Sequence, residues 1–105
     1  MNKFEKKLHE NNLKKIDEKL TKVCELRIEL QKMYLNGLSG DETSNRYKEL
    51  SNKYQYLLME WANDYVITHY MKSTDLKTVD DLIKENINEM NAIVLEREKE
   101  LKATK

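Results

Sequence analysis

Apolar side chains recur every three or four residues along most of this chain, which is the spacing of one face of an α-helix. A second periodic stretch begins after the sequence NGLSGD (36–41), and a third begins around STDLKTVDD (73–81). The pattern predicts helices over about 2–36, 42–73 and 78–102. The stripe of the first helix consists of Leu13, Ile16, Leu20, Val23, Arg27, Leu30 and Tyr34.

The residues at the predicted helix ends suit those positions. Asn36–Gly37 favours a left-handed end to the first helix. Thr78, with Asp81 three residues later, resembles a capping box at the start of the third. The start of the second helix has three candidate caps, namely Ser39, Asp41 and Thr43.

Long helices joined by short linkers limit the architectures that are open to this chain. It has 105 residues, two glycines and no proline, so the frequent turns of a β-sandwich or a doubly wound fold are excluded. We expect an all-α fold with three long antiparallel helices in an elongated bundle, a helical hairpin plus a third helix laid along it. Residues 1–105 are expected to form a single domain.

The second predicted helix is apolar on two faces. Residues 47–70 hold six of the eight aromatic side chains. One face, from Tyr47 to Tyr65, is an ordinary core stripe. The other is predicted to be a partner or dimer interface, unless the third helix covers it. Its members are Tyr56, Met59, Val66, Ile67 and Tyr70.

Two arginines occupy positions in apolar stripes. Arg27 lies between Val23 and Leu30, and Arg97 interrupts the third helix in the same way. Antiparallel packing would bring both to the level of Tyr54, so Arg27, Tyr54 and Arg97 are predicted to form a polar cluster in mid-bundle. The guanidinium groups then either reach nearby carboxylates or Tyr54, or they form a pocket for an anion.

The segment KKIDEKLTKVCELRIEL (14–30) resembles the first helix of the all-helical chorismate mutases, and Arg27 matches the active-site arginine of that family. The resemblance implies a dimer that rearranges a dicarboxylate without a cofactor. It covers under a fifth of the chain, and Leu38 stands near the position where the family has a lysine. An enzyme with an Arg27/Arg97 anion pocket is therefore the least favoured of the alternative functions.

Charge and composition restrict the kinds of partner. Nineteen basic residues balance nineteen acidic ones, so nucleic-acid binding is not expected. The longest uninterrupted apolar run is YLLM (56–59), too short for a membrane span. A single cysteine fits a reducing compartment, and we expect a cytoplasmic protein. Sixteen lysines against three arginines suggest a low-GC bacterium or its phage.

The residue patterns that carry chemistry are missing from the sequence. His9 and His69 are not in metal-binding pairs, and Cys24 lies at the edge of an apolar stripe. We therefore predict no catalytic residues, no cofactor and no metal. The expected function is a non-enzymatic protein–protein interaction module, which forms a homodimer and binds and inhibits or modulates a host protein. The main alternative is a structural coiled-coil subunit.

Overall fold

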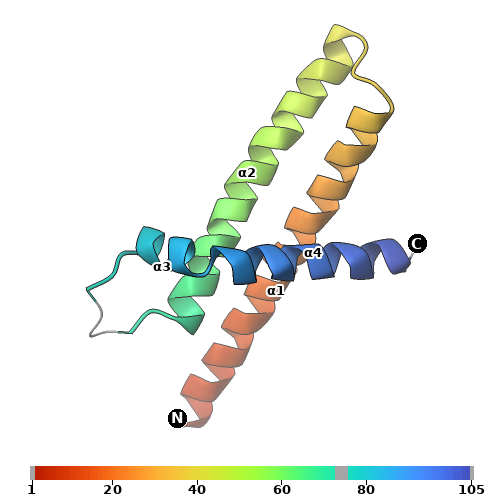
Figure 1. Cartoon of the computed structure of the whole chain (residues 1–105). Helices are drawn as coiled ribbons and strands as arrows, with labels where there is room; N and C mark the ends of the chain where they lie inside the picture. Colours follow the sequence, from red (N-terminus) through yellow and green to blue (C-terminus); the bar gives the residue numbers. More distant parts are fainter. Residues whose placement is uncertain (1, 73–75, 105) are drawn as a thin grey trace.

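The computed structural model describes residues 2–72 and 76–104, which form four helices and no strand. Figure 1 shows α1 (Lys3–Leu35) and α2 (Asp41–His69) side by side with opposite chain directions, and α4 (Ile87–Ala103) lying across this hairpin. The short α3 (Val79–Glu85) packs on α2. The molecule measures 54 × 31 × 22 Å. The predicted all-helical, elongated fold is confirmed.

The prediction of three long helices is wrong, because the third segment is divided at Asn86. The side-chain amide of Asn86 donates a hydrogen bond to the Leu82 carbonyl at 2.8 Å, and its backbone departs from helical geometry at φ −113° and ψ 14°. Asparagine competes in this way with the regular helix ladder. In Figure 1, α4 then crosses the hairpin instead of running along it.

The observed helix ends agree with two of the three predictions. Gly37 has φ +89°, the left-handed region that glycine enters without strain, and Thr78 and Asp81 form the expected capping box. The prediction for α2 is wrong, since its N-cap is Gly40, also at φ +89°, and makes no side-chain cap hydrogen bond. The second helix was expected to reach 73, which lies outside the described residues. The helix itself ends earlier, at His69, and the described residues 70–72 are not helical.

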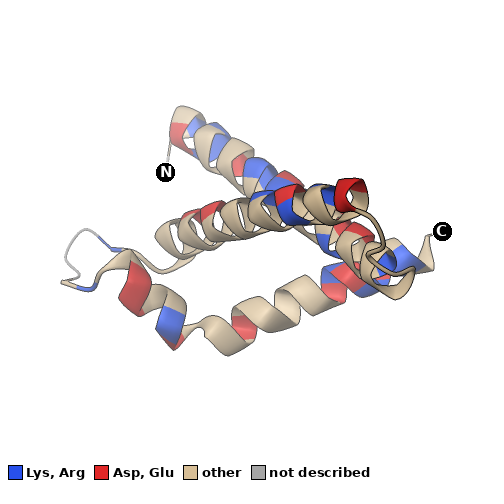
Figure 2. Cartoon of the chain, turned by 90° about the horizontal axis from the view of Figure 1, so that it is seen from above, with Lys and Arg blue, Asp and Glu red and all other residues tan. Residues whose placement is uncertain are grey.

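The core lies where α4 crosses the hairpin. Between residues 87 and 95, Glu89 is the single charged side chain, and this half of α4 is mostly tan in Figure 2. Its apolar side chains cover Cys24 of α1 and Trp61 of α2, which are almost completely buried. The buried cluster consists of Ile16, Leu20, Val23, Cys24, Trp61, Ala62, Val66, Leu82, Met90 and Val94.

Because α4 is shorter than the hairpin and crosses it, it leaves both ends of the hairpin uncovered. At one end, residues 2–12 of α1 are all exposed. At the other end, α1 and α2 alone form a two-helix tip that is closed by the turn at residues 36–40. The two-helix tip supplies one of the candidate surfaces, and the outer side of α2 supplies the other.

Candidate interaction surfaces

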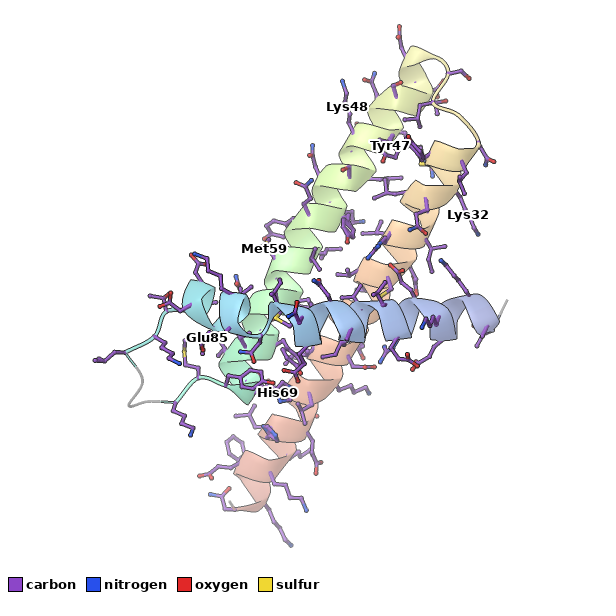
Figure 3. All side chains as sticks on the ribbon, in the orientation of Figure 1. Lys32, Tyr47, Lys48, Met59, His69 and Glu85 are labelled. Carbon is purple, nitrogen blue, oxygen red and sulfur yellow. The ribbon has the colours of Figure 1, made fainter. Side chains whose placement is uncertain are left out.

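Three of the five residues predicted for a partner or dimer interface are exposed on α2. Tyr56, Met59 and Ile67 have exposed fractions of 67%, 51% and 46%. Figure 3 shows Met59 on the side of α2 away from α1. We call these three residues the α2 outer strip; Ile67 lies at its edge, where it also lines a groove with Ile16 and Lys19 of α1.

The other two predicted residues are used inside the chain. Val66 has no exposed area and belongs to the same buried cluster as Leu82 of α3, so it is a core residue and cannot be reached by a partner in this structure. The Tyr70 hydroxyl donates a hydrogen bond to Glu89 of α4, and the Tyr65 hydroxyl donates another to the same carboxylate at 3.2 Å. Burial raises the pKa of Tyr65 well above its usual value, and the carboxylate of Glu89 raises it further.

The two arginines do not converge, so the predicted mid-bundle cluster forms only in part. Arg97 reaches Asp17 at 2.5 Å and donates to the Thr21 hydroxyl at 2.8 Å. Arg27 instead lies beside Tyr54, and both line one groove that does not include Arg97. The reason is the crossing of α4 over α1, which separates the two arginines along α1. Among the described residues, Arg27 lines the groove beside Tyr54, whereas Arg97 lines a different hollow beside Trp61.

The partner of Arg27 is Glu98, a residue that the sequence reasoning missed. Arg27 Nε lies 3.1 Å from Glu98 Oε1, and Glu98 is only 4% exposed. Within the described part of the chain, Oε1 accepts no hydrogen bond of good geometry. A signal was available in the sequence, because Glu98 stands four residues after Val94 and three before Leu101, in the apolar stripe of α4.

Cys24 is close to this pair and is fully buried. Its thiol donates to the backbone carbonyl of Val94, with 3.5 Å between sulfur and oxygen. Burial raises the pKa of Cys24 to about 11. The thiol is therefore protonated at neutral pH, and the environment is the opposite of the one that activates a nucleophilic cysteine.

A groove of about 640 Å³ opens between α1 and α2 at the two-helix tip. Figure 3 shows Tyr47 pointing from α2 toward α1 in this region. Burial raises the pKa of Tyr54, and the positive charge of Arg27 partly opposes that effect. We call this feature the tip groove; its main lining residues are Arg27, Leu30, Tyr34, Leu35, Tyr47 and Tyr54.

The tip groove could not be foreseen from the periodicity. The same stripe was expected to pack against a third helix along the full hairpin, which would have buried Tyr34. Tyr34 is instead 68% exposed, because α4 crosses the hairpin farther from the turn.

Among residues 2–72 and 76–104, no group of three or more His, Cys, Asp or Glu side chains could hold a metal ion. No helix in this described part is both long and apolar enough to cross a membrane. No protein-family model matches the chain, and comparisons with curated proteins and with solved structures find no match.

Proposed function

We propose that this chain is a non-enzymatic protein–protein interaction module, which forms a homodimer through the α2 outer strip and acts by covering a surface of another protein. The observation that carries the proposal is the exposure of Tyr56, Met59 and Ile67 on one side of α2. A side chain on the outer side of a surface helix is usually polar or charged. These three are large and mainly apolar, and they are exposed to solvent.

The chemistry of the outer strip suits a contact between proteins. Tyr56 offers a large apolar area with a polar tip, and Met59 adapts its shape to an irregular surface. The strip extends from Tyr56 to Ile67, about 16 Å along the helix axis. None of its three side chains is charged, and the neighbouring Glu60 is paired with Lys19 of the same chain, which limits repulsion between two copies.

A two-fold axis gives the simplest arrangement of two such strips. When two α2 helices pack in opposite directions, Tyr56 of one copy lies opposite Ile67 of the second copy, and the reverse contact forms at the other end. Met59 then occupies the centre with Asn63, which is half-buried in the isolated chain. Because each copy contributes only about three turns, the dimer should dissociate on dilution.

The proposed role of the dimer is to bind and modulate a host protein. A small chain with balanced charges, in which we predict no catalytic residues, suits a phage or mobile-element protein, or a small regulator of a low-GC bacterium. The residues with the strongest claim to chemistry support a structural role: Cys24 is buried and protonated, and Arg27 is paired with Glu98. The specificity of such a module would lie in its exposed side chains.

The test is a double substitution, Tyr56→Glu with Met59→Glu, which places two charges in the proposed dimer contact. Both side chains are exposed, so helicity by circular dichroism should stay unchanged while association is lost. The matched control is Asn88→Glu with Ala92→Glu, which adds the same charges at exposed positions on α4. Retention of the dimer by the α2 variant would refute the proposed interface.

A structural assembly subunit is the second candidate, and the elongated shape of 54 × 31 × 22 Å favours it. In that case self-association is the whole function, and no other protein is bound. Affinity capture on the immobilised dimer from a low-GC host separates the two candidates. A partner that is captured by wild type and is lost with a surface variant supports the interaction module.

A further inference from the structure

We propose that the tip groove is a second contact site, which takes one amphipathic helix of a partner protein and pairs an acidic side chain of that helix with Arg27. This inference rests on the proposed function, since it names the class of partner that the module covers. It concerns a different surface from the α2 outer strip, so the two proposals can fail separately.

The form of the groove suits a helix better than a small ligand. Tyr34 and Leu35, on its α1 side, are 68% and 81% exposed. Walls this open cannot enclose most of the surface of a small molecule, as ligand pockets do. The α1 side, from Arg27 to Leu35, is eight residues long, or about 12 Å, which corresponds to roughly two turns of a docked helix.

The electrostatics of the groove call for an acidic partner. Arg27 is the one charged side chain among the described residues that line it, and no carboxylate lines it. Lys32 and Lys48 lie on the outer flanks of α1 and α2 in Figure 3. A carboxylate that docks here meets Arg27 inside the groove and the two lysines on its flanks, while Glu29 and Glu49 of the same helices reduce the net positive charge.

Arg27 has donors to offer even though it is paired. Its contact with Glu98 is made through Nε at 3.1 Å, and its guanidinium group also interacts with the Tyr54 hydroxyl. Arginine presents five N–H donors in a planar fork, so one edge can hold Glu98 while the η-amino groups bind a second carboxylate.

The chain itself shows which kind of helix this hairpin binds. Where α4 crosses α1, it presents Val94 and Leu101 to the core and the carboxylate of Glu98 to Arg27. The tip continues the same pair of helices without such a cover. A partner helix with an apolar stripe and a carboxylate at its edge would supply at the tip what α4 supplies at the centre.

Charge also argues against a second copy in this groove. An isologous contact between two tips would bring Arg27 of one copy near Arg27 of the second copy, with Lys32 and Lys48 doubled on the flanks. Glu98 of the same chain reduces this repulsion, but the groove lining contains no carboxylate that a second copy could place on Arg27. An acidic helix of a different protein would bring a carboxylate to Arg27 and would avoid this repulsion.

The experiment uses a pair of synthetic helical peptides as probes. Each has about fourteen residues, because shorter isolated helices are marginal in water. Both carry leucines at i, i+3 and i+7, and they differ in having either glutamate or lysine at the edge of that stripe. Fluorescence anisotropy with the full chain should show that the glutamate peptide binds at least about tenfold more tightly than the lysine peptide.

Two variants locate the binding. Tyr34→Ala with Leu35→Ala removes apolar contacts at exposed positions and should weaken binding of the glutamate peptide at least about tenfold. The outer-strip variant, Tyr56→Glu with Met59→Glu, should bind the peptide as wild type does. That result would hold even if the proposed dimer does not exist.

Three outcomes would overturn the proposal. The first is that neither peptide binds, and the second is that both bind equally. The third is that the tip variant of Tyr34 and Leu35 lowers the solution mass and leaves peptide binding unchanged, in which case the occupant is a second copy.

Discussion

Glu98 of α4 is buried against Arg27 of α1, with 3.1 Å between Oε1 and Nε. This pair, together with the contact between Arg97 and Asp17, joins the crossing helix to the hairpin at two separate levels. Glu98 is desolvated, whereas Arg27 remains partly open to the tip groove. The two residues therefore contribute unequally to stability.

Removal of Arg27 should be more costly than neutralisation of Glu98. Arg27→Ala leaves a buried carboxylate without its cation, and we expect a loss of about 3 kcal/mol in the free energy of unfolding. Glu98→Gln removes the charge itself, so its loss should be smaller. The double variant Arg27→Met with Glu98→Leu should regain stability over Arg27→Ala. Urea denaturation measures all three, and equal losses for the two single variants would refute this account of the pair.

Cys24 should make the protein less stable in alkali. Its pKa is raised by burial from 9.0 to about 11, so the unfolded chain releases the thiol proton before the folded chain does. The stabilisation is complete below pH 9 and is lost as the pH rises toward 11. From pH 9 to pH 10 the free energy of unfolding should fall by about 1 kcal/mol through this group.

Cys24→Ala is the control, since it should abolish that part of the fall. The comparison should be made below pH 10, because the pKa values of Tyr54, Tyr65, Tyr70 and Lys19 are also raised and lower the stability in the same direction at higher pH. Identical slopes for wild type and Cys24→Ala between pH 9 and pH 10 would contradict the prediction.

The short helix α3 should depend on its capping box. Thr78→Ala removes the acceptor for the Asp81 backbone N–H, which lies at 3.1 Å, and should cost about 1 kcal/mol, whereas Thr78→Ser keeps the oxygen. Hydrogen exchange at the Leu82 amide, which bonds to the Thr78 carbonyl, reports the local effect. If serine and alanine give the same exchange rate, the side-chain cap contributes nothing.

The register of the proposed dimer can be tested directly. Tyr56→Cys and Ile67→Cys, made in separate chains and mixed under oxidising conditions, should form mixed disulfides faster than either variant forms disulfides with itself. Opposite packing of two α2 helices places these positions side by side, while Cys24 is buried and does not interfere. A preference for self-pairing at Tyr56→Cys would instead indicate a different register.

The apolar periodicity predicted the helices of the hairpin well because each of them carries an apolar core stripe at helical spacing. Ile16, Leu20 and Val23 are all buried as expected, and the first helix ends within one residue of the predicted position. Periodicity says which side of a helix is buried. It does not say at what angle the next helix crosses that side.

That missing angle explains the errors in the third segment and in the sites. The interruption depends on the side-chain hydrogen bond of Asn86 to the Leu82 carbonyl, which competes with the backbone hydrogen bonds of the helix. The apolar periodicity continues through this position and gives no sign of the break. Because α4 crosses the hairpin, Arg97 lies apart from Arg27, Glu98 is buried and Tyr34 is exposed. Each of these depends on the packing of distant helices and could not follow from the sequence pattern of a single helix.

The most direct test of the proposed interaction module is the solution mass over a wide concentration range, by light scattering coupled to size exclusion. Wild type should rise from the monomer mass of 12.6 kDa toward twice that value as the concentration increases. The variant with Tyr56→Glu and Met59→Glu should stay at the monomer mass with unchanged helicity. If wild type and variant have the same mass at every concentration, the α2 outer strip is not a dimer interface and the central claim is wrong.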